Sequence, residues 1–327
     1  MNDRFGRKIN YLRISITDRC NLSCFYCKGM GKVVSHAEIL RYEDMERLLR
    51  AACSLGIKKV RLTGGEPFLR RNFWDFLTKL TANFPELDFR ITTNATLLAQ
   101  EDAILRLKDL GIFKLNISLD TFSPKKFKLI TKTDLLKNVL KAIELGLKHG
   151  LGLKINVVAL KGINDDELEK FVLFACEHPV DVRFIEFMPI GQKNLWSQDY
   201  FWSSEQILNA IQKIVTLEKL KHLYTSGPAT VYKIVGGKGR IGVISPLSNH
   251  FCNECNRLRI TSVGRLRPCL FSDQEYKLVG LLRNPKISQN QLELVLAKIS
   301  LNKPIGTELL KQKNKEVCLT KMVNIGG

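Results

Sequence analysis

The sequence predicts an α/β protein, an incomplete (βα)6 TIM-like barrel followed by a smaller C-terminal α+β module. Three observations support this fold. Short β-rich runs alternate six times with helical segments up to about residue 190. Cysteine, glycine and polar motifs fall repeatedly where these runs end. The alternation then stops, so we divide the chain into a barrel of residues 1–190 and a module of residues 191–327.

The predicted strands are rich in Val, Ile, Leu, Thr and Phe, which favour extended backbone. The segments between them repeat apolar residues at spacings of three and four, as amphipathic helices do. Three of these helices end at Gly56, Gly111 and Gly150, because glycine suits the helix C-terminus. The strands cover 11–17, 58–63, 88–93, 113–119, 153–160 and 181–187, and the helices lie within 42–56, 71–84, 101–111, 133–150 and 165–178.

The positions of the motifs favour a barrel over an open sheet. In a barrel the carboxyl ends of all strands meet at one mouth, whereas an open sheet brings together only the ends near its switch point. Five strands end at conspicuous motifs, which are DRCNLSCFYC, GGEP, TTN, SLD and FMP. One shared site explains all of them. In the module, residues 229–246 predict a hairpin that turns at GGKG, and we expect the module to close the open side of the barrel.

Composition indicates a soluble protein whose partners are anionic. The chain has 327 residues, of which 45% are hydrophobic and 25% are charged. No stretch approaches the ~18 uninterrupted apolar residues that a membrane span needs, so we expect a cytoplasmic protein without a membrane partner. The net charge of +19 favours nucleic acid, an anionic membrane or a polyphosphate ligand. Charge alone does not choose among these.

The cysteines divide into two groups of three and three isolated residues. Clustered thiols in a reducing compartment are more often metal ligands than disulfides. We interpret the isolated Cys53, Cys176 and Cys318 as small buried hydrophobic residues. The two groups are Cys20, Cys24 and Cys27, and Cys252, Cys255 and Cys269.

The first group poses a choice between zinc and an iron-sulfur cluster. A structural zinc site closes with four ligands, whereas a cubane held by three thiolates keeps one iron open. The residues themselves leave open a zinc site with a distant fourth ligand. The Cx3Cx2C loop after a first strand, with Tyr26 before its last cysteine, resembles the radical S-adenosylmethionine (SAM) enzymes. That resemblance implies that the open iron of a [4Fe-4S] cluster chelates SAM, and that one electron cleaves it to a 5′-deoxyadenosyl radical.

Further strand ends match the SAM site of that superfamily. TGGEP at 63–67 combines glycines for close backbone approach with a carboxylate that suits an ammonium group. By itself this motif would be a tight turn. The resemblance implies that Tyr26 binds SAM, that Gly65 contacts its methionine part, and that Ser118 and Met188 contact its ribose and adenine.

The second group of cysteines indicates a particular family among the radical SAM enzymes. Cys252 and Cys255 form a CxxC pair with Cys269 further along, and zinc with His250 as fourth ligand is the generic alternative. The pattern from LRISITDRC to Gly326-Gly327 resembles the GTP 3′,8-cyclase family of molybdenum cofactor biosynthesis. The resemblance implies a lyase in which a second [4Fe-4S] cluster holds the purine of GTP. It implies GTP contacts, with Mg²⁺ on the triphosphate, from Arg13, Arg61, Thr92, Lys154, Arg257 and Arg259.

The implied reaction joins ribose C3′ of GTP to guanine C8, giving (8S)-3′,8-cyclo-7,8-dihydroguanosine 5′-triphosphate. Gly326 and Gly327 are implied to form a tail that reaches the active site. The implied partners are cyclic pyranopterin monophosphate synthase, a flavodoxin or ferredoxin as reductant, and a second copy in a homodimer. One departure is Lys28-Gly29, where the family has Met-Pro. It removes no ligand and concerns the conformation of the loop.

Two alternatives remain at this point. Another radical SAM enzyme with an auxiliary cluster, acting on a peptide or RNA, would explain the first cysteine loop and the charge. A zinc-stabilised nucleic-acid-binding protein would explain the charge and the CxxC pair. The latter leaves the strand-end motifs without a purpose, and the chain lacks an evident set of interleaved aromatic residues for base stacking. We therefore expect no nucleic-acid partner.

Overall fold

The computed structural model describes residues 1–27, 34–35, 37–190, 197–221, 227–312 and 322–325. Within them, one twelve-stranded sheet has the order β12-β11-β10-β1-β2-β3-β4-β5-β6-β9-β8-β7. Its parallel part comprises β10 Arg257–Ile260, β1 Tyr11–Ser15, β2 Lys59–Thr63, β3 Asp88–Thr93, β4 Lys114–Ser118, β5 Gly152–Ala159, β6 Asp181–Glu186 and β9 Arg240–Ile244. Its antiparallel margins are β11 Arg265–Arg267 and β12 Tyr276–Lys277, and β8 Thr230–Ile234 and β7 Leu217–Lys219.

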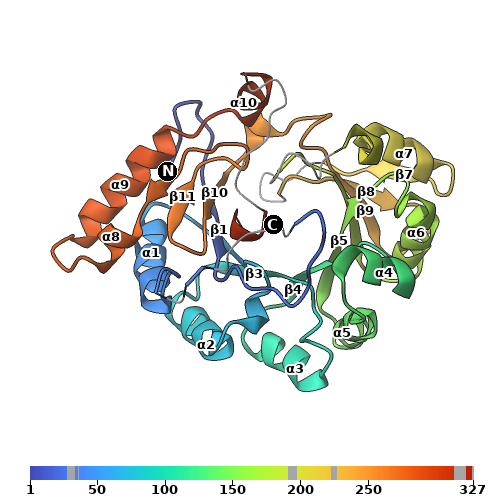
Figure 1. The fold of residues 1–327 in the computed structure, drawn as a ribbon, viewed down its shortest axis with the longest axis horizontal. Coiled ribbons are helices and arrows are strands. Elements are labelled where there is room, and N and C mark those ends of the chain that lie inside the picture. Colours follow the sequence, from blue (N-terminus) through green and yellow to red (C-terminus); the bar gives the residue numbers. More distant parts are fainter. Residues whose placement is uncertain (28–33, 36, 191–196, 222–226, 313–321, 326–327) are drawn as a thin grey trace.

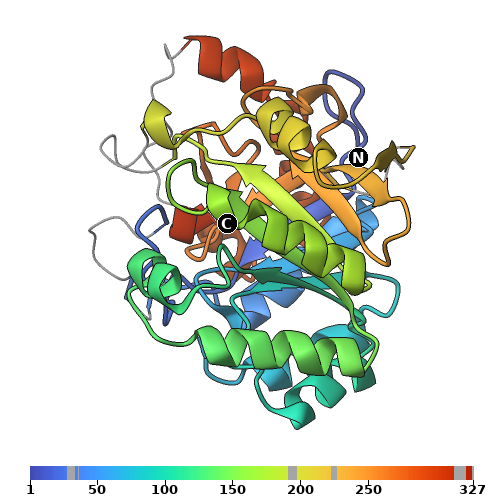
Figure 2. The same ribbon diagram turned by 90° about the vertical axis from the view of Figure 1, so that its right-hand side faces the viewer.

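Helices surround the curved sheet on its outer side (Figure 1). The turned view shows the green helices of the barrel covering the outer face of the strands (Figure 2). The α-helices are α1 Tyr42–Ser54, α2 Phe73–Asn83, α3 Glu101–Asp109, α4 Pro124–Thr131, α5 Leu136–Lys148, α6 Leu168–Glu177, α7 Ser204–Gln212, α8 Val279–Arg283, α9 Gln289–Leu301, α10 Gly306–Gln312 and α11 Met322–Ile325. Short 3₁₀ helices span Pro67–Leu69, Asp165–Glu167, Gln198–Tyr200 and Cys252–Glu254.

The six predicted barrel strands are confirmed, with ends that differ by at most two residues. Alternation along each strand places apolar side chains toward the helices and polar ones toward the inside. In β1, Leu12 and Ile14 are buried in the main core, whereas Arg13 between them lines the interior cavity. The fold therefore presents a row of polar side chains to the inside of the barrel.

The helix ends also follow the sequence. Gly56, Gly111 and Gly150 have φ values of +87°, +71° and +70°, a conformation that side chains disfavour. Helix α4 was not among the predicted helices. It begins after Ser123, whose hydroxyl accepts from the Lys126 N–H at 3.5 Å.

The module does not form a separate layer, because its strands continue the barrel sheet at both edges. β10 pairs in parallel with β1, and β9 pairs in parallel with β6. The predicted hairpin is confirmed as β8 and β9 around Gly236, which has a φ of +78°. One hydrophobic cluster includes residues of both parts. The sheet thus has eight parallel strands, and two of them come from the module.

Two expectations about isolated cysteines need correction. Cys53 and Cys176 are only partly buried, because each lies on a helix where it packs against the margin of the core. Cys318 lies outside the described residues, as do Lys28-Gly29 and Gly326-Gly327. The described part of the chain contains no helix that is both long and apolar enough to cross a membrane.

Candidate active site

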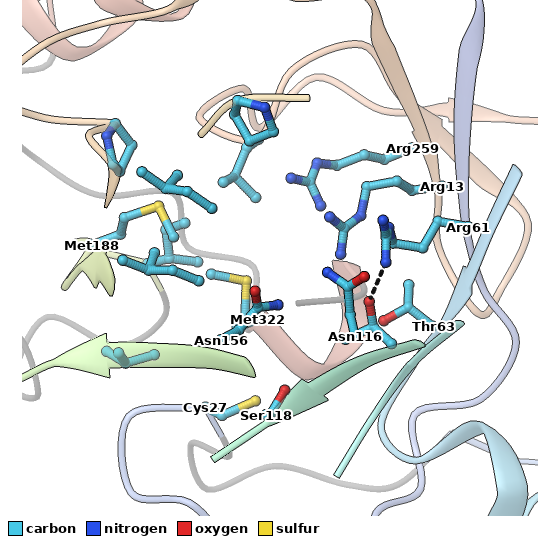
Figure 3. A pocket seen from close by; sticks show the side chains of 18 of the residues that line it. Arg13, Cys27, Arg61, Thr63, Asn116, Ser118, Asn156, Met188, Arg259 and Met322 are labelled. Carbon is cyan, nitrogen blue, oxygen red and sulfur yellow. Dashed lines mark hydrogen bonds between the residues drawn. The ribbon is translucent and has the colours of Figure 1, made fainter. Parts of the chain in front are cut away.

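A cavity of about 320 Å³ lies inside the barrel, at the carboxyl ends of the parallel strands. Its volume is at the lower end of the usual range for small-molecule sites. Strand-end residues of β1 to β6, both cysteine loops and Met322 of α11 line it (Figure 3). All six cysteines of the two groups are among its lining residues. The structure therefore brings the two triads, 225 residues apart in the chain, to one enclosed space.

The first triad, Cys20, Cys24 and Cys27, lies on a loop anchored to the end of α4. The Ser23 N–H donates to the Thr131 carbonyl at 2.9 Å, and the Phe25 N–H donates to the Ile130 carbonyl at 3.1 Å. Two further donors approach the Cys20 sulfur, which are the Leu22 N–H at 3.4 Å and the Asn94 side-chain amide at 3.7 Å. N–H groups directed at sulfur stabilise a thiolate and tune the potential of a cluster bound to it.

The electrostatics of this loop fit a cationic metal centre. Burial raises the pKa of the Cys24 thiol well above its usual value, and Asp120, Cys27 and Cys20 raise it further. Three thiolates that line one cavity are unfavourable unless a positive group compensates them. The donor set of soft sulfur ligands suits iron-sulfur or zinc chemistry.

The residues predicted to bind SAM line the same cavity. Tyr26, Gly65, Ser118 and Met188 all contribute to its wall. The Tyr26 hydroxyl donates to Asp120, whose other oxygen accepts from the Val158 N–H at 2.8 Å. This contact holds the aromatic ring at the base of the cysteine loop.

Glycine is required at Gly64 and Gly65 because the loop after β1 crosses directly over them. A Cβ atom at Gly65 would lie 2.1 Å from the Arg19 carbonyl oxygen, and one at Gly64 would lie 2.4 Å from that of Thr17. Gly64 also has a φ of +154°. The two glycines thus allow the TGGEP motif to pack directly beneath the cysteine loop.

The Glu66 carboxylate of that motif faces away from the cavity. It accepts hydrogen bonds from the Thr93 hydroxyl and the Asn94 N–H, each at 2.7 Å, and from the Phe68 N–H at 3.2 Å. The side chain is fully buried, and burial raises its pKa to about 7. The expected contact of this carboxylate with an ammonium group stays a prediction; in the structure its oxygens accept hydrogen bonds from the loop after β3.

Three arginines point into the cavity from adjacent strands (Figure 3). Arg259 of β10, Arg13 of β1 and Arg61 of β2 are in register. Arg61 donates to the Thr92 hydroxyl at 3.1 Å and to the Tyr11 hydroxyl at 2.5 Å. Burial together with Arg259 lowers the pKa of Arg13 well below its usual value, and burial together with Arg257 lowers that of Arg259 to about 10. Such a row is unfavourable by itself and suits a polyanionic ligand.

The remaining predicted GTP contacts divide between the cavity and its surroundings. Arg257 and Thr92 line the cavity, and the Arg257 guanidinium lies over the Phe251 ring at 5.0 Å. Lys154 is not a lining residue. Its ammonium lies 3.1 Å from Asp181, and burial, followed by the charge of Arg183, lowers its pKa to about 8.

Sequence reasoning assigned no binding role to three polar residues on the inner faces of β4, β5 and β6. Asn116, Asn156 and Arg183 line the cavity. The side-chain oxygens of Asn116 and Asn156 and the Nε of Arg183 are buried and have no hydrogen-bond partner among the described residues. Such atoms mark where a ligand would complete the hydrogen bonding. The available signal was the inward position of each residue in a strand otherwise rich in apolar residues.

The second triad consists of Cys252, Cys255 and Cys269. These cysteines line the same cavity from a different part of the chain. Gly306 packs against two of its sulfurs, since a Cβ there would lie 3.0 Å from the Cys269 sulfur and 3.4 Å from that of Cys252. Burial raises the pKa of the Cys255 thiol, but Lys303 and Arg257 outweigh burial and lower it to about 6. A cradle without a side chain and a thiol favoured as thiolate fit a bound cluster.

Neither triad forms a site for a single ion. In the ranges that the structure describes, no three or more Cys, His, Asp or Glu side chains are grouped to hold one metal ion. His250, the proposed fourth zinc ligand, is exposed and its Nδ1 lies 2.7 Å from the Pro246 carbonyl oxygen. A cubane is larger than one ion, so the thiolates that hold it stand further apart.

Helix α11 brings the end of the described chain into the mouth of the barrel (Figure 1). Met322 lines the cavity. Ile325 is fully buried in a small cluster with Ile190 and Phe271, which follow β6 and the second triad respectively. The described part of the chain thus ends in a cluster that Cys269 of the second triad also packs against.

Two family models match successive parts of the chain. Residues 14–175 match the radical SAM superfamily, and residues 180–309 match the family described as Molybdenum Cofactor Synthesis C. The chain is 42% identical to a GTP 3′,8-cyclase of Alkaliphilus oremlandii over 320 residues, covering 97% of each chain. It is 41% identical to that of Thermodesulfovibrio yellowstonii over 335 residues, covering both chains fully.

Among solved structures, the fold is similar to that of Streptococcus suis SuiB bound to S-adenosylmethionine. The TM-score is 0.65 at 15% sequence identity, and the match covers 97% of this chain and 77% of that one. The expected incomplete barrel with a C-terminal module is thereby confirmed as a fold shared with solved proteins.

Proposed function

The chain belongs to the GTP 3′,8-cyclase family of the radical SAM superfamily, and on this basis we propose that it cyclises GTP in molybdenum cofactor biosynthesis. One observation carries the proposal most directly. A single cavity is lined by two cysteine triads and by the row of Arg13, Arg61 and Arg259. Family membership favours this function over the two alternatives, a peptide- or RNA-modifying radical enzyme and a zinc-stabilised nucleic-acid-binding protein.

A [4Fe-4S] cluster on Cys20, Cys24 and Cys27 would supply one-electron cleavage of SAM to a 5′-deoxyadenosyl radical. The chain's own residues position SAM and exclude water. Gly64 and Gly65 allow close approach of the backbone, and the Tyr26 contact with Asp120 orients the loop. We assign SAM contacts to Tyr26, Gly65, Ser118 and Met188, which all line the cavity.

The proposed binding of GTP rests on the positive charge of the residues that line the cavity. Arg13, Arg61, Arg257 and Arg259 present donors to a triphosphate, with Mg²⁺ neutralising part of its charge. Thr92 is already held by Arg61, and Lys154, on the same face of β5 as Asn156, is paired with Asp181. Asn116, Asn156 and Arg183 add unsatisfied polar atoms for the nucleoside.

A second [4Fe-4S] cluster on Cys252, Cys255 and Cys269 would hold the purine. We propose that residues 1–190 provide the SAM site and residues 191–327 this second site, with Gly326 and Gly327 reaching the cavity beyond Ile325. Family resemblance supports a flavodoxin or ferredoxin as reductant, cyclic pyranopterin monophosphate synthase as the enzyme that consumes the product, and a homodimer.

Incubation of the anaerobically reconstituted protein with reductant, SAM and GTP tests this function by mass spectrometry. One hydrogen atom leaves C3′ of GTP, and the cyclised radical then gains one proton and one electron. The product therefore has the same mass as GTP. Chromatographic retention and fragmentation therefore have to distinguish it. GTP deuterated at C3′ should yield deuterated 5′-deoxyadenosine. Unlabelled 5′-deoxyadenosine with unchanged GTP would contradict the proposal.

Metal analysis tests the two clusters separately. Two cubanes require about eight iron and about eight sulfide per chain, with thiolate-to-iron absorption in the visible range. Stoichiometric zinc in place of iron would contradict the assignment.

A further inference from the structure

Two buried cations, Arg7 and Lys303, lie beside the second cysteine triad. Their exposed fractions are 5% and 1%, and both line the cavity. Buried lysine and arginine are rare unless the structure uses their charge or their hydrogen bonds. Neither residue belongs to the sites assigned above.

Arg7 connects the N-terminal segment to the first cysteine of this triad. Its Nη1 donates to the Cys252 carbonyl at 2.8 Å, and its Nη2 donates to the carbonyls of Lys303 at 2.9 Å and Pro304 at 3.1 Å. Asp3, itself 5% exposed, pairs with the Arg7 Nε at 2.5 Å. A buried carboxylate therefore fixes the guanidinium of Arg7, which holds a cysteine loop 245 residues further along the chain.

Lys303 connects the segments that carry the other two cysteines. Its ammonium donates to the Pro268 carbonyl at 2.6 Å, directly before Cys269, and to the Arg257 carbonyl at 2.9 Å, two residues after Cys255. Together the two cations reach all three segments of the triad. The Arg7 contact with the Lys303 carbonyl joins the two into one network.

The charge of Lys303 is not balanced by a carboxylate. Across the described ranges, no Asp or Glu lies within ion-pair distance of its ammonium, and its hydrogen-bond acceptors are neutral carbonyls. A buried unpaired ammonium is costly unless anions lie near it. The three cysteines of the second triad line the same cavity, and as thiolates of a bound cluster they would supply the compensating negative charge.

We propose that Arg7 and Lys303 are positioning residues for the second [4Fe-4S] cluster, an inference that rests on the proposed function. They hold the three cysteine segments at their backbone carbonyls, and Lys303 supplies a positive charge beside the thiolates. Groups around a metal site that orient its ligands change metal retention and potential without contacting substrate.

The variant Lys303→Met tests this proposal, because it removes the charge and nearly keeps the size of the side chain. The matched control is Lys298→Met on the exposed side of α9. We expect reconstituted Lys303→Met to hold about four iron per chain, or to lose the second cluster to a chelator about tenfold faster. Reductive cleavage of SAM without GTP should persist, since the first triad is untouched. Lys298→Met should resemble the wild type, and Lys303→Arg should retain more iron than Lys303→Met.

The potential gives a second readout that a merely structural role would not move. Loss of a nearby positive charge disfavours the reduced cluster, so any second cluster remaining in Lys303→Met should have a more negative midpoint potential in an EPR-monitored titration. Wild-type iron retention together with an unchanged potential would overturn the proposal. Equal loss of both clusters and of SAM cleavage would also overturn it, because that result indicates a general role in folding. A wild-type protein with two clusters that fails to cyclise GTP would instead contradict only the proposed function.

Discussion

At the scale of single residues, buried carboxylates at strand ends hold the loops around the cavity. Glu66 accepts from the Asn94 N–H, and Glu186 accepts from the Leu247 N–H at 2.9 Å. Both carboxylates are fully buried. Each connects a strand end to a loop from another part of the chain and so holds that loop in position. Glu186 also lines the cavity, whereas Glu66 does not. Hydrogen bonds to buried charged groups are among the stronger ones in proteins.

Glu66 should make stability depend on pH. Its pKa is raised from 4.5 to about 7 in the folded protein. Between these values the folded chain holds a proton that the unfolded chain has released, so the free energy of unfolding should fall as pH rises through this interval. A shift of this size corresponds to a few kcal/mol at most. Urea denaturation of the metal-free protein from pH 5 to pH 8 measures it.

The control for this pH effect is a substitution of an exposed glutamate. Glu66→Gln should show a flatter dependence between pH 5 and pH 7, whereas Glu205→Gln on the surface of α7 should keep the wild-type slope. Asp120, whose pKa burial raises to about 6, contributes in all three proteins. An unchanged slope in Glu66→Gln would mean that this carboxylate is not the group responsible.

Cys252→Ser should separate the two halves of the reaction. Because Cys252 belongs to the second triad, we expect reductive cleavage of SAM to persist while formation of the cyclised nucleotide is abolished. Both products can be measured by chromatography in one assay. Cys53→Ser on α1, outside the cavity, should retain both activities. Equal loss of both activities in Cys252→Ser would show that the two cysteine sites are not separate.

At the scale of elements, α4 explains how a short cysteine loop is held in one position. The last carbonyls of a helix have no partners within the helix. In α4, those of Ile130 and Thr131 accept from Phe25 and Ser23 of the cysteine loop. The Ser123-Pro124 sequence is a helix-start signal, because serine caps the N-terminus and proline suits the first turn. This signal could have identified α4 in advance.

Helix α11 should matter more for cyclisation than for cleavage of SAM. Ile325→Ala removes apolar contacts with Ile190 and Phe271, and such a loss costs about 2–5 kcal/mol in a well-packed core. We expect GTP cyclisation to fall at least about tenfold, since Met322 of α11 lines the cavity. Leu294→Ala, exposed on α9, is the control. If the Ile325→Ala variant cyclised GTP at the wild-type rate, the apolar contacts of Ile325 would not be needed for the function of α11.

At the scale of the whole molecule, the two parts of the chain form one folding unit. β9 and β10 cover the edges of β6 and β1. Residues 1–190 alone would expose both edges and the core that the module covers, which favours aggregation. We predict that this fragment does not unfold cooperatively as a monomer, as judged by size-exclusion chromatography and thermal melting. Co-expression with residues 191–327 should restore soluble protein, and a stable monomeric fragment would contradict the prediction.

The sequence by itself determined the strands, most helices and the candidate ligand residues. Strand alternation and helix periodicity are set by local backbone geometry, so six strands could be placed to within two residues. The cysteine spacing and strand-end motifs are also local. Because parallel strands place their carboxyl ends at one mouth, these motifs predicted a shared site, and the cavity contains them.

Only the tertiary structure decided which partners the charged side chains find and which distant segments of the chain pair. Glu66 accepts a hydrogen bond from the loop after β3, and Lys154 pairs with Asp181 of the neighbouring strand β6. Arg7 reaches a carbonyl 245 residues away. Such contacts depend on how the whole sheet curves and on which strands occupy its edges. They have no local periodicity, and so no sequence pattern records them.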